Sequence, residues 1–320
     1  MLLTNEMMDG VFKTMFWHVK IRVTTRCNMA CAHCYAASEQ YKTYEHERLE
    51  NFEWVDRLAK NPRIRFLHLQ GGEPTLEPEA MKECAKISHH YGKQICLFTN
   101  GKRLYEDENF RNEFLSYGID NIVVSYNKYL EAQTDQAKVV NTLMHFFEDK
   151  PNINFGTTAI VDRKHISNLQ KWIDFGGWPP YHPEDFPDYE EALENRKYWK
   201  MQLPLCWSDR GEVTGANEDV PRVKWPGLTC DFSTVLMPSG FLQADCGCSS
   251  VKQCLLGFID DFGDDPIEYI AKWRGDYGKF DCYANGFYEF CLAEPGKYTC
   301  LKKYPPRTRP DSEYEERMKF

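Results

Sequence analysis

The feature that most constrains the fold is an alternation of short apolar segments with longer amphipathic segments between residues 17 and 175. Short apolar runs are typical of buried strands, and apolar residues spaced three or four apart are typical of helices. Strands that alternate with helices form parallel sheets through right-handed crossovers. The pattern predicts strands at 18–25, 64–70, 94–99, 121–125, 153–160 and 201–207, and helices at 44–60, 78–91, 110–117, 132–148 and 166–175. The predicted fold class is therefore α/β, a partial (β/α)6 barrel.

Three cysteines directly follow the first predicted strand. Cys27, Cys31 and Cys34 have the spacing C-x3-C-x2-C. A loop this short can bring three thiolates to a single metal ion or metal cluster, and it supplies no fourth thiol nearby. An iron–sulfur cube on these three cysteines keeps one iron open, and an open metal position is typical of a catalytic site. The alternatives are a zinc site or a surface group of unrelated thiols, although zinc sites favour paired C-x2-C arms.

The next three predicted strands also end in polar or glycine-containing motifs. Gly71–Pro74 reads Gly-Gly-Glu-Pro after the second strand, and residues 99–101 read Thr-Asn-Gly after the third. Residues 125–127, after the fourth, read Ser-Tyr-Asn. In barrels of this type active residues gather at the carboxyl ends of the strands. A Gly-Gly turn or an Asn-Gly turn alone also has a purely structural explanation, so the informative feature is the succession of motifs at strand ends.

The cysteine spacing, the aromatic His33 before the third cysteine and the Gly-Gly-Glu-Pro motif together resemble the signature of the radical S-adenosylmethionine (SAM) enzymes. The resemblance implies that Cys27, Cys31 and Cys34 hold a [4Fe–4S] cluster whose open iron takes the amino and carboxylate groups of SAM. It also implies reductive cleavage of SAM to a 5′-deoxyadenosyl radical, which removes a hydrogen atom from the substrate, so the cofactor supplies the difficult chemistry. The resemblance places the following residues at the cofactor: Gly71, Gly72, Glu73, Pro74, His33 and Ser125. Asn100 is a further candidate for lining the same pocket, and an Asn-Gly turn explains it about as well.

The resemblance also implies individual roles. Glycines at 71 and 72 let the backbone come close to SAM, and Glu73 is an acceptor for the SAM ammonium group. Ser125 stands where related enzymes place a polar contact to the ribose or carboxylate of SAM, whereas Asn127 stands where an aspartate is frequent. Cys84 and Cys96 lie in a predicted helix and strand and are expected to be small buried hydrophobic residues.

A second group of cysteines follows residue 228. Cys230 precedes an alternating run, a Pro-Ser-Gly turn and a second run that ends near Cys246 and Cys248, which predicts a β-hairpin with thiols at both ends. With Leu256–Ile259 and the amphipathic segment 267–273, this region resembles the SPASM/twitch extension of radical SAM enzymes, which implies an auxiliary [4Fe–4S] cluster. A zinc site made from the same thiols is the alternative. The expected auxiliary ligands are Cys230, Cys246 or Cys248, Cys282 and Cys291, and the candidate hydrogen-atom donors are Cys248 and Cys254.

Composition disfavours several other classes of protein, such as nucleic-acid-binding, secreted and membrane-spanning proteins. The net charge is −9 without a basic stripe, so no nucleic-acid partner is expected. The first residues form no signal peptide and no apolar run is long enough to cross a membrane. Thirteen cysteines without a secretory signal favour a reducing compartment and metal ligation over disulfides, so a cytoplasmic protein is expected. The expected domains are an N-terminal extension (1–16), the barrel (17–210, with a lid or insertion at 176–200), the auxiliary domain (211–301) and a tail (302–320).

The sequence therefore predicts a radical SAM enzyme, either an oxidoreductase or an enzyme that modifies peptides or natural products. Its expected partners are a small polar metabolite, such as a sugar or nucleoside, or a ribosomal peptide as substrate, together with a reductant such as flavodoxin or ferredoxin. Two alternatives remain open. A non-catalytic iron–sulfur electron-transfer protein predicts clusters without SAM cleavage, and a zinc-stabilised binding module predicts zinc without iron.

Overall fold

The computed structural model describes residues 17–31, 34, 48–126, 134–160, 199–202, 233–244, 255–263 and 265–266. Its strands form one nine-stranded sheet in the order β6-β5-β4-β3-β2-β1-β7-β8-β9. The first six strands pair in parallel with their neighbours, which confirms the predicted α/β fold class. These strands are β1 (Trp17–Thr24), β2 (Ile64–Gly71), β3 (Gln94–Thr99), β4 (Asn121–Tyr126), β5 (Asn154–Ile160) and β6 (Trp199–Gln202).

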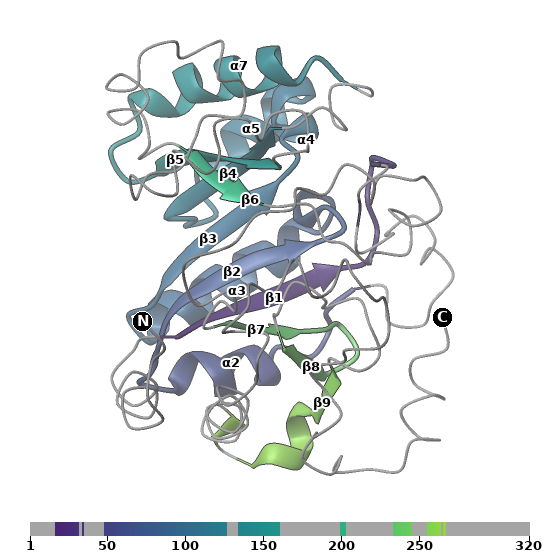
Figure 1. Ribbon diagram of the computed structural model, residues 1–320. Coiled ribbons are helices and arrows are strands. Elements are labelled where there is room, and N and C mark those ends of the chain that lie inside the picture. The colour runs from purple at the N-terminus through teal and green to yellow at the C-terminus, as the bar shows by residue number, and fades with distance from the viewer. Residues whose placement is uncertain are drawn as a thin grey trace, which may run out of the picture.

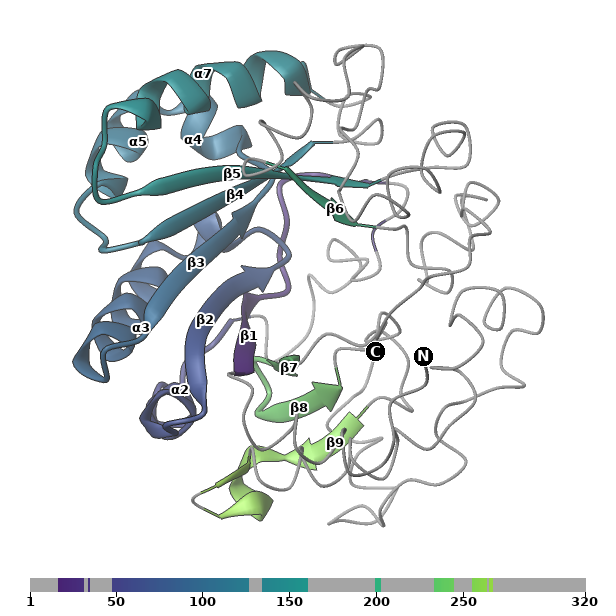
Figure 2. The same cartoon turned by 60° about the vertical axis from the view of Figure 1, so that its left-hand side comes forward.

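The labelled α-helices cover one face of this curved sheet, as Figures 1 and 2 show. They are α2 (Glu53–Lys60), α3 (Pro78–His90), α4 (Lys102–Glu106), α5 (Glu108–Phe114) and α7 (Gln136–Glu148). Odd-numbered residues of β1 point into the core beneath them, because successive side chains of a strand alternate between faces. Val19, Ile21 and Val23 are each fully buried in that core. A single apolar layer between sheet and helices thus fixes the positions of the strand ends.

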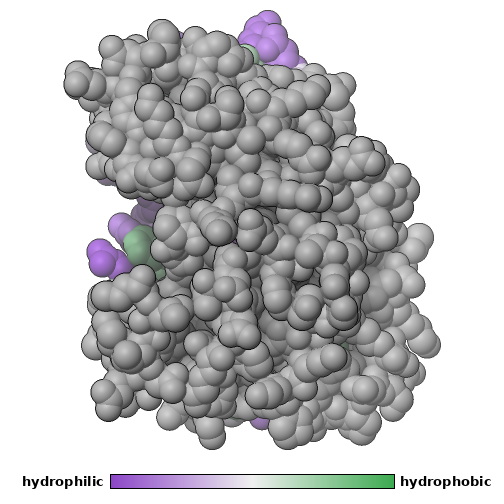
Figure 3. Space-filling view, in the orientation of Figure 1, coloured by the Kyte–Doolittle hydropathy of each residue, from purple (hydrophilic) through white to green (hydrophobic). Residues whose placement is uncertain are grey.

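Polar and aromatic side chains occupy the alternate positions of β1 and β2. His18 and His68 belong to this set, and their rings stack with centroids 4.7 Å apart. His68 also contacts the Phe98 ring of β3 at 5.3 Å. At the surface, the described residues visible in Figure 3 are mostly hydrophilic, and among the described residues the exposed large hydrophobic side chains are Leu115 and Met144.

Several predicted boundaries were wrong. The helix predicted at 44–60 begins only at Glu53, because Arg48 forms an isolated bridge with Thr24 and the N–H of Leu49 donates to the carbonyl of Val23 at 2.8 Å. Helix α4 was not predicted, and α5 ends at Phe114, before the expected 117. Helix α7 begins at Gln136, later than the expected 132, and β6 begins at 199, earlier than the expected 201. The predicted helices at 166–175 and 267–273 lie outside the described residues.

The predicted hairpin is confirmed, and it joins the barrel sheet. Strands β7 (Ser233–Leu236) and β8 (Phe241–Ala244) pair antiparallel, and β7 pairs in parallel with β1 on the side away from β2. The turn requires Gly240, whose φ is +86° and whose missing Cβ would lie 2.8 Å from the Trp54 ring. Strand β9 (Leu255–Phe258) pairs antiparallel with β8 and leads into a short 3-10 helix, η7 (Ile259–Phe262). Within the described residues, no helix is long and apolar enough to cross a membrane.

Candidate metal and cofactor site

The Gly-Gly-Glu-Pro turn packs directly against the start of the cysteine loop. The N–H of Gly72 donates to the carbonyl of Thr24 at 2.8 Å, and the N–H of Glu73 donates to the carbonyl of Arg26 at 2.7 Å. A Cβ atom on Gly72 would lie 1.8 Å from the carbonyl oxygen of Arg26. A side chain at position 72 is therefore excluded by contact between two backbone segments of the protein itself. The turn and the loop form one unit at the carboxyl ends of β1 and β2.

Glu73 joins the ends of β2 and β3 through a buried carboxylate. Its side chain is 1 % exposed. Oε1 accepts from the hydroxyls of Thr99 at 2.6 Å and Thr75 at 2.8 Å and from the Thr75 N–H at 3.2 Å, and Oε2 accepts from the Asn100 N–H at 2.8 Å. Burial raises the pKa of Glu73, while these donated hydrogen bonds act in the opposite direction. The contact of Glu73 with the SAM ammonium group remains a prediction, and the four hydrogen bonds show what the carboxylate does within the chain.

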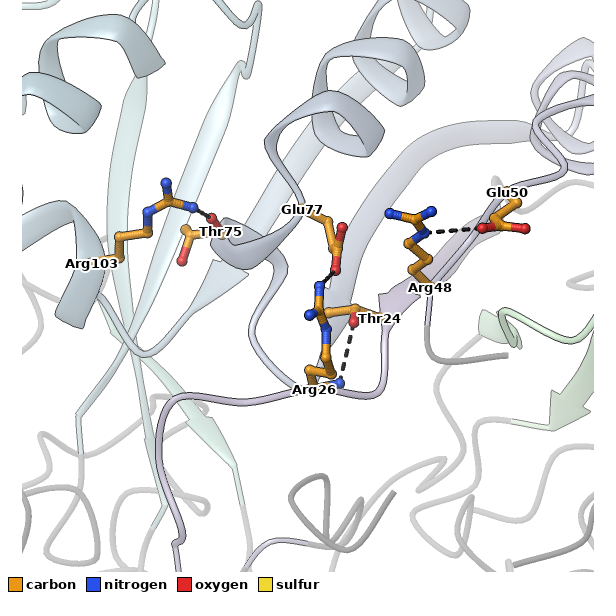
Figure 4. Close-up of polar contacts among 7 residues, drawn as sticks. All are labelled: Thr24, Arg26, Arg48, Glu50, Thr75, Glu77 and Arg103. Carbon is orange, nitrogen blue, oxygen red and sulfur yellow. Dashed lines mark hydrogen bonds and ion pairs between the residues drawn. The ribbon is translucent and has the colours of Figure 1, made fainter. Parts of the chain in front are cut away.

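Two arginines bind the segment that follows the Gly-Gly-Glu-Pro turn (Figure 4). Arg26, inside the cysteine loop, forms an ion pair with Glu77, which immediately precedes α3. Arg103 of α4 donates to the carbonyl of Thr75 in the short 3-10 helix η2 (Pro74–Leu76). The guanidinium of Arg103 also lies over the ring of Phe110 at 3.9 Å. Sequence reasoning missed both arginines, because single arginines without a motif do not indicate their partners.

The three cysteines of the loop follow the carboxyl end of β1, and each is only partly buried. The N–H of Cys34 donates to the carbonyl of Cys31 at 3.0 Å, which closes a turn between the second and third thiols. Burial raises the pKa of Cys27 to about 12, with smaller contributions from the charges of Glu73, Cys34 and Cys31. Among the described residues, no three His, Cys, Asp or Glu side chains converge on a position for one metal ion.

The donor set fits an iron–sulfur cluster on chemical grounds. Iron–sulfur clusters are held by cysteine thiolates, and all three candidates are cysteines, with Cys31 and Cys34 near enough to Cys27 to contribute to its raised pKa. Because only a thiolate is a metal ligand, metal binding must release the thiol protons. Cys84 and Cys96 are buried in α3 and β3, which confirms that they pack as hydrophobic residues.

The ends of β3 and β4 are joined by a residue that sequence reasoning missed. Gln136, the first residue of α7, is fully buried. Its Nε2 donates to the carbonyl of Asn100 at 3.0 Å and to the carbonyl of Ser125. The sequence contains only a weak signal for Gln136, which is a polar residue directly after the helix-capping Asp135. Asn100 and Ser125, both predicted to contact SAM, are thus held by their main chains at the same edge as the cysteine loop.

The remaining predicted site residues lie outside the described residues, and their roles stay predictions. The set comprises the aromatic residue of the cysteine motif, the polar residue after β4, the auxiliary ligands and the candidate hydrogen-atom donors: His33, Asn127, Cys230, Cys246, Cys248, Cys254, Cys282 and Cys291.

Comparison with known proteins finds similarity over the part of the chain that contains this site. The model of the radical SAM superfamily matches residues 21–145. Over 156 residues the chain is 29 % identical to "Putative peptide biosynthesis protein YydG" of Bacillus subtilis, which covers 47 % of this chain and 48 % of that protein. Over 89 residues it is 30 % identical to GTP 3′,8-cyclase 1 of Pseudomonas aeruginosa, which covers 27 % of each. The crystal structure of BtrN in complex with AdoMet and 2-DOIA matches with 12 % identity and a TM-score of 0.46, covering 85 % of this chain and 93 % of that one.

The matched segment contains the cysteine loop, the Gly-Gly-Glu-Pro turn and strands β2 to β4. Over this segment the chain is therefore similar to the radical SAM superfamily. It spans about half the length of the first curated relatives that it matches, 48 % and 57 %.

Proposed function

We propose that the protein is a radical SAM enzyme that cleaves SAM reductively and removes a hydrogen atom from its substrate. The observation that carries this proposal is the unit formed by the cysteine loop and the Gly-Gly-Glu-Pro turn, which two backbone hydrogen bonds join at the carboxyl ends of parallel strands. Cys27, Cys31 and Cys34 would hold a [4Fe–4S] cluster, which together with bound SAM would supply the reductive S–C5′ cleavage and the radical chemistry.

The chain's own residues would bind and orient. Cys27, Cys31 and Cys34 would hold the cluster as thiolates, since only the deprotonated form is a metal ligand. The backbone of Gly71–Pro74, fixed against Thr24 and Arg26, would present its polar groups to the amino group of SAM. The Ser125 side chain, at the end of β4, would contact the ribose or the carboxylate.

The experiment is anaerobic reconstitution with iron and sulfide, reduction, addition of SAM and measurement of 5′-deoxyadenosine beside the iron content. The proposal expects deoxyadenosine that depends on the reductant. Iron without SAM cleavage under any reductant would instead support the electron-transfer protein, and zinc without iron would support the binding module. About eight irons per chain would support an auxiliary cluster on the later cysteines, and about four would support the loop cluster alone.

Two substrate classes have support. A peptide that undergoes maturation is favoured by the printed name of the relative from Bacillus subtilis, which assigns it to peptide biosynthesis. A nucleoside-like small polar molecule is favoured by the several matches to GTP 3′,8-cyclases. Incubation with each class, followed by mass spectrometry in D2O, would distinguish them by which substrate exchanges deuterium or changes mass.

A further inference from the structure

Asn100 links the Gly-Gly-Glu-Pro turn to the cysteine loop. It lies just after β3 and is 8 % exposed. Its N–H donates to Oε2 of Glu73 at 2.8 Å, and its carbonyl accepts from Gln136 at 3.0 Å. Its side-chain Oδ1 accepts from the N–H of Lys102 at 2.9 Å, at the start of α4. The main chain and the amide oxygen of Asn100 are therefore occupied by Glu73, Gln136 and Lys102, which fixes the plane of the amide group.

The side-chain nitrogen of Asn100 points the other way, into the cysteine loop. Nδ2 donates to Oδ1 of Asn28 at 2.8 Å and lies 4.0 Å from Sγ of Cys27. The bond to Asn28 has ordinary hydrogen-bond length, whereas the distance to sulfur is at the outer limit for such a bond. An Asn-Gly turn explains Oδ1 and the following Gly101, whose φ is +78°. It does not explain a donor directed at the residue pair 27–28.

We propose that Asn100 is a positioning residue for the cluster, which rests on the proposed function. It anchors Asn28 and directs an amide N–H toward the sulfur of Cys27. Hydrogen bonds to cluster sulfurs tune reduction potentials, and partners of the direct ligands tune a metal site. A donor near a ligand sulfur stabilises the reduced, more negative cluster. Asn100 thus raises the midpoint potential of the loop cluster and helps the loop retain it.

The main test variant is Asn100→Ser. Serine accepts a hydrogen bond from a backbone N–H in a similar turn, so the start of α4 is preserved. The substitution removes the amide donor toward Asn28 and Cys27 and adds no charge. In the iron-reconstituted full chain, an EPR-monitored redox titration should show a lower midpoint potential. The ratio of reduced to oxidised cluster at a fixed potential should fall about fivefold, the equilibrium equivalent of one ordinary hydrogen bond. Iron loss to a chelator should be faster than in wild type.

A second variant keeps the test decisive if Asn100→Ser does not fold. Asn28→Ala changes an exposed residue, removes the acceptor of Asn100 and leaves the turn unchanged. It keeps the amide donor toward Cys27, so it should speed iron loss to a chelator while its potential stays closer to wild type than that of Asn100→Ser. A wild-type potential in Asn100→Ser, or wild-type iron retention in Asn28→Ala, would overturn the proposal. Because this titration needs no SAM, its failure is distinguishable from a failure of SAM cleavage.

Discussion

The Gly-Gly-Glu-Pro turn and the cysteine loop lie side by side at one edge of the sheet, yet they are held in different ways. In the turn, Glu73 is 1 % exposed and accepts four hydrogen bonds from Thr75, Thr99 and Asn100. In the loop, the three thiols are each partly exposed, and the contacts to the rest of the chain include the backbone of Thr24 and Arg26, the ion pair of Arg26 with Glu77 and the side chain of Asn28.

The difference shows which part is complete without a cofactor. The turn satisfies its buried polar groups from within the chain, as buried polar groups must be satisfied for stability. Under the proposed function, the three sulfurs of the loop would bind a cluster. Variants of the turn should therefore change the stability of the metal-free protein, and variants of the thiols should change cluster binding while leaving that stability nearly unchanged.

The largest expected effect is on catalysis, in Cys31→Ala. The loss of one of the three thiol ligands should lower the rate of 5′-deoxyadenosine formation by at least about a hundredfold. The melting temperature of the metal-free protein should stay near wild type because this thiol is partly exposed. Cys84→Ala is the matched control. It removes a fully buried sulfur, so it should lower the free energy of unfolding by about 1 to 2 kcal/mol and keep product formation. Product from Cys31→Ala would contradict the assignment of the loop.

Gly72→Ala should have the largest effect on stability. Its Cβ would lie 1.8 Å from a backbone oxygen, so the turn must separate from the loop, at a cost of about 3 kcal/mol or more. Gly92→Ala is the control: φ is +64° with no atom within 4 Å of the new Cβ, and the expected cost is about 1 kcal/mol. Urea unfolding of the two metal-free variants measures both. Equal costs would show that the close approach of turn and loop is not maintained in solution.

Glu73→Ala should have the next largest effect. It leaves the buried N–H groups of Asn100 and Thr75 without their acceptor, and each such loss costs about 1 to 3 kcal/mol. Urea unfolding should show a loss of about 2 to 4 kcal/mol. Glu79→Ala is the comparison variant, because that side chain is 84 % exposed and pairs with Lys82, so its effect should stay below about 1 kcal/mol. A Glu73→Ala protein as stable as Glu79→Ala would remove the distinction between turn and loop.

Gln136→Ala should have the smallest of these effects. It removes the donor shared by the carbonyls of Asn100 and Ser125 and should cost about 1 to 2 kcal/mol. Lys138→Ala, two residues later and exposed, should cost little. If Gln136→Ala also lowers the affinity for SAM, the end of β4 contributes to the cofactor site. Unchanged stability would show that α7 is held by its apolar face alone.

The local sequence pattern was sufficient for strands β1 to β5, and it was insufficient for β6 and for the contacts between strands. Strand β3 has the predicted bounds because a short apolar run between polar residues is a local signal. The helix predicted at 44–60 was too long because the bridge from Arg48 to Thr24 joins residues far apart in the chain. For the same reason the sequence motif identified Glu73 without indicating that its partners, Thr99 and Asn100, come from the next strand.

The measurement that tests the central claim most directly is the EPR spectrum of the reduced, reconstituted protein with and without SAM. SAM on the open iron of a cluster held by Cys27, Cys31 and Cys34 predicts a change in the g values on addition of SAM, absent from Cys31→Ala. A reduced cluster with the same spectrum before and after SAM would contradict the account, because the loop would then hold a cluster that does not bind this cofactor.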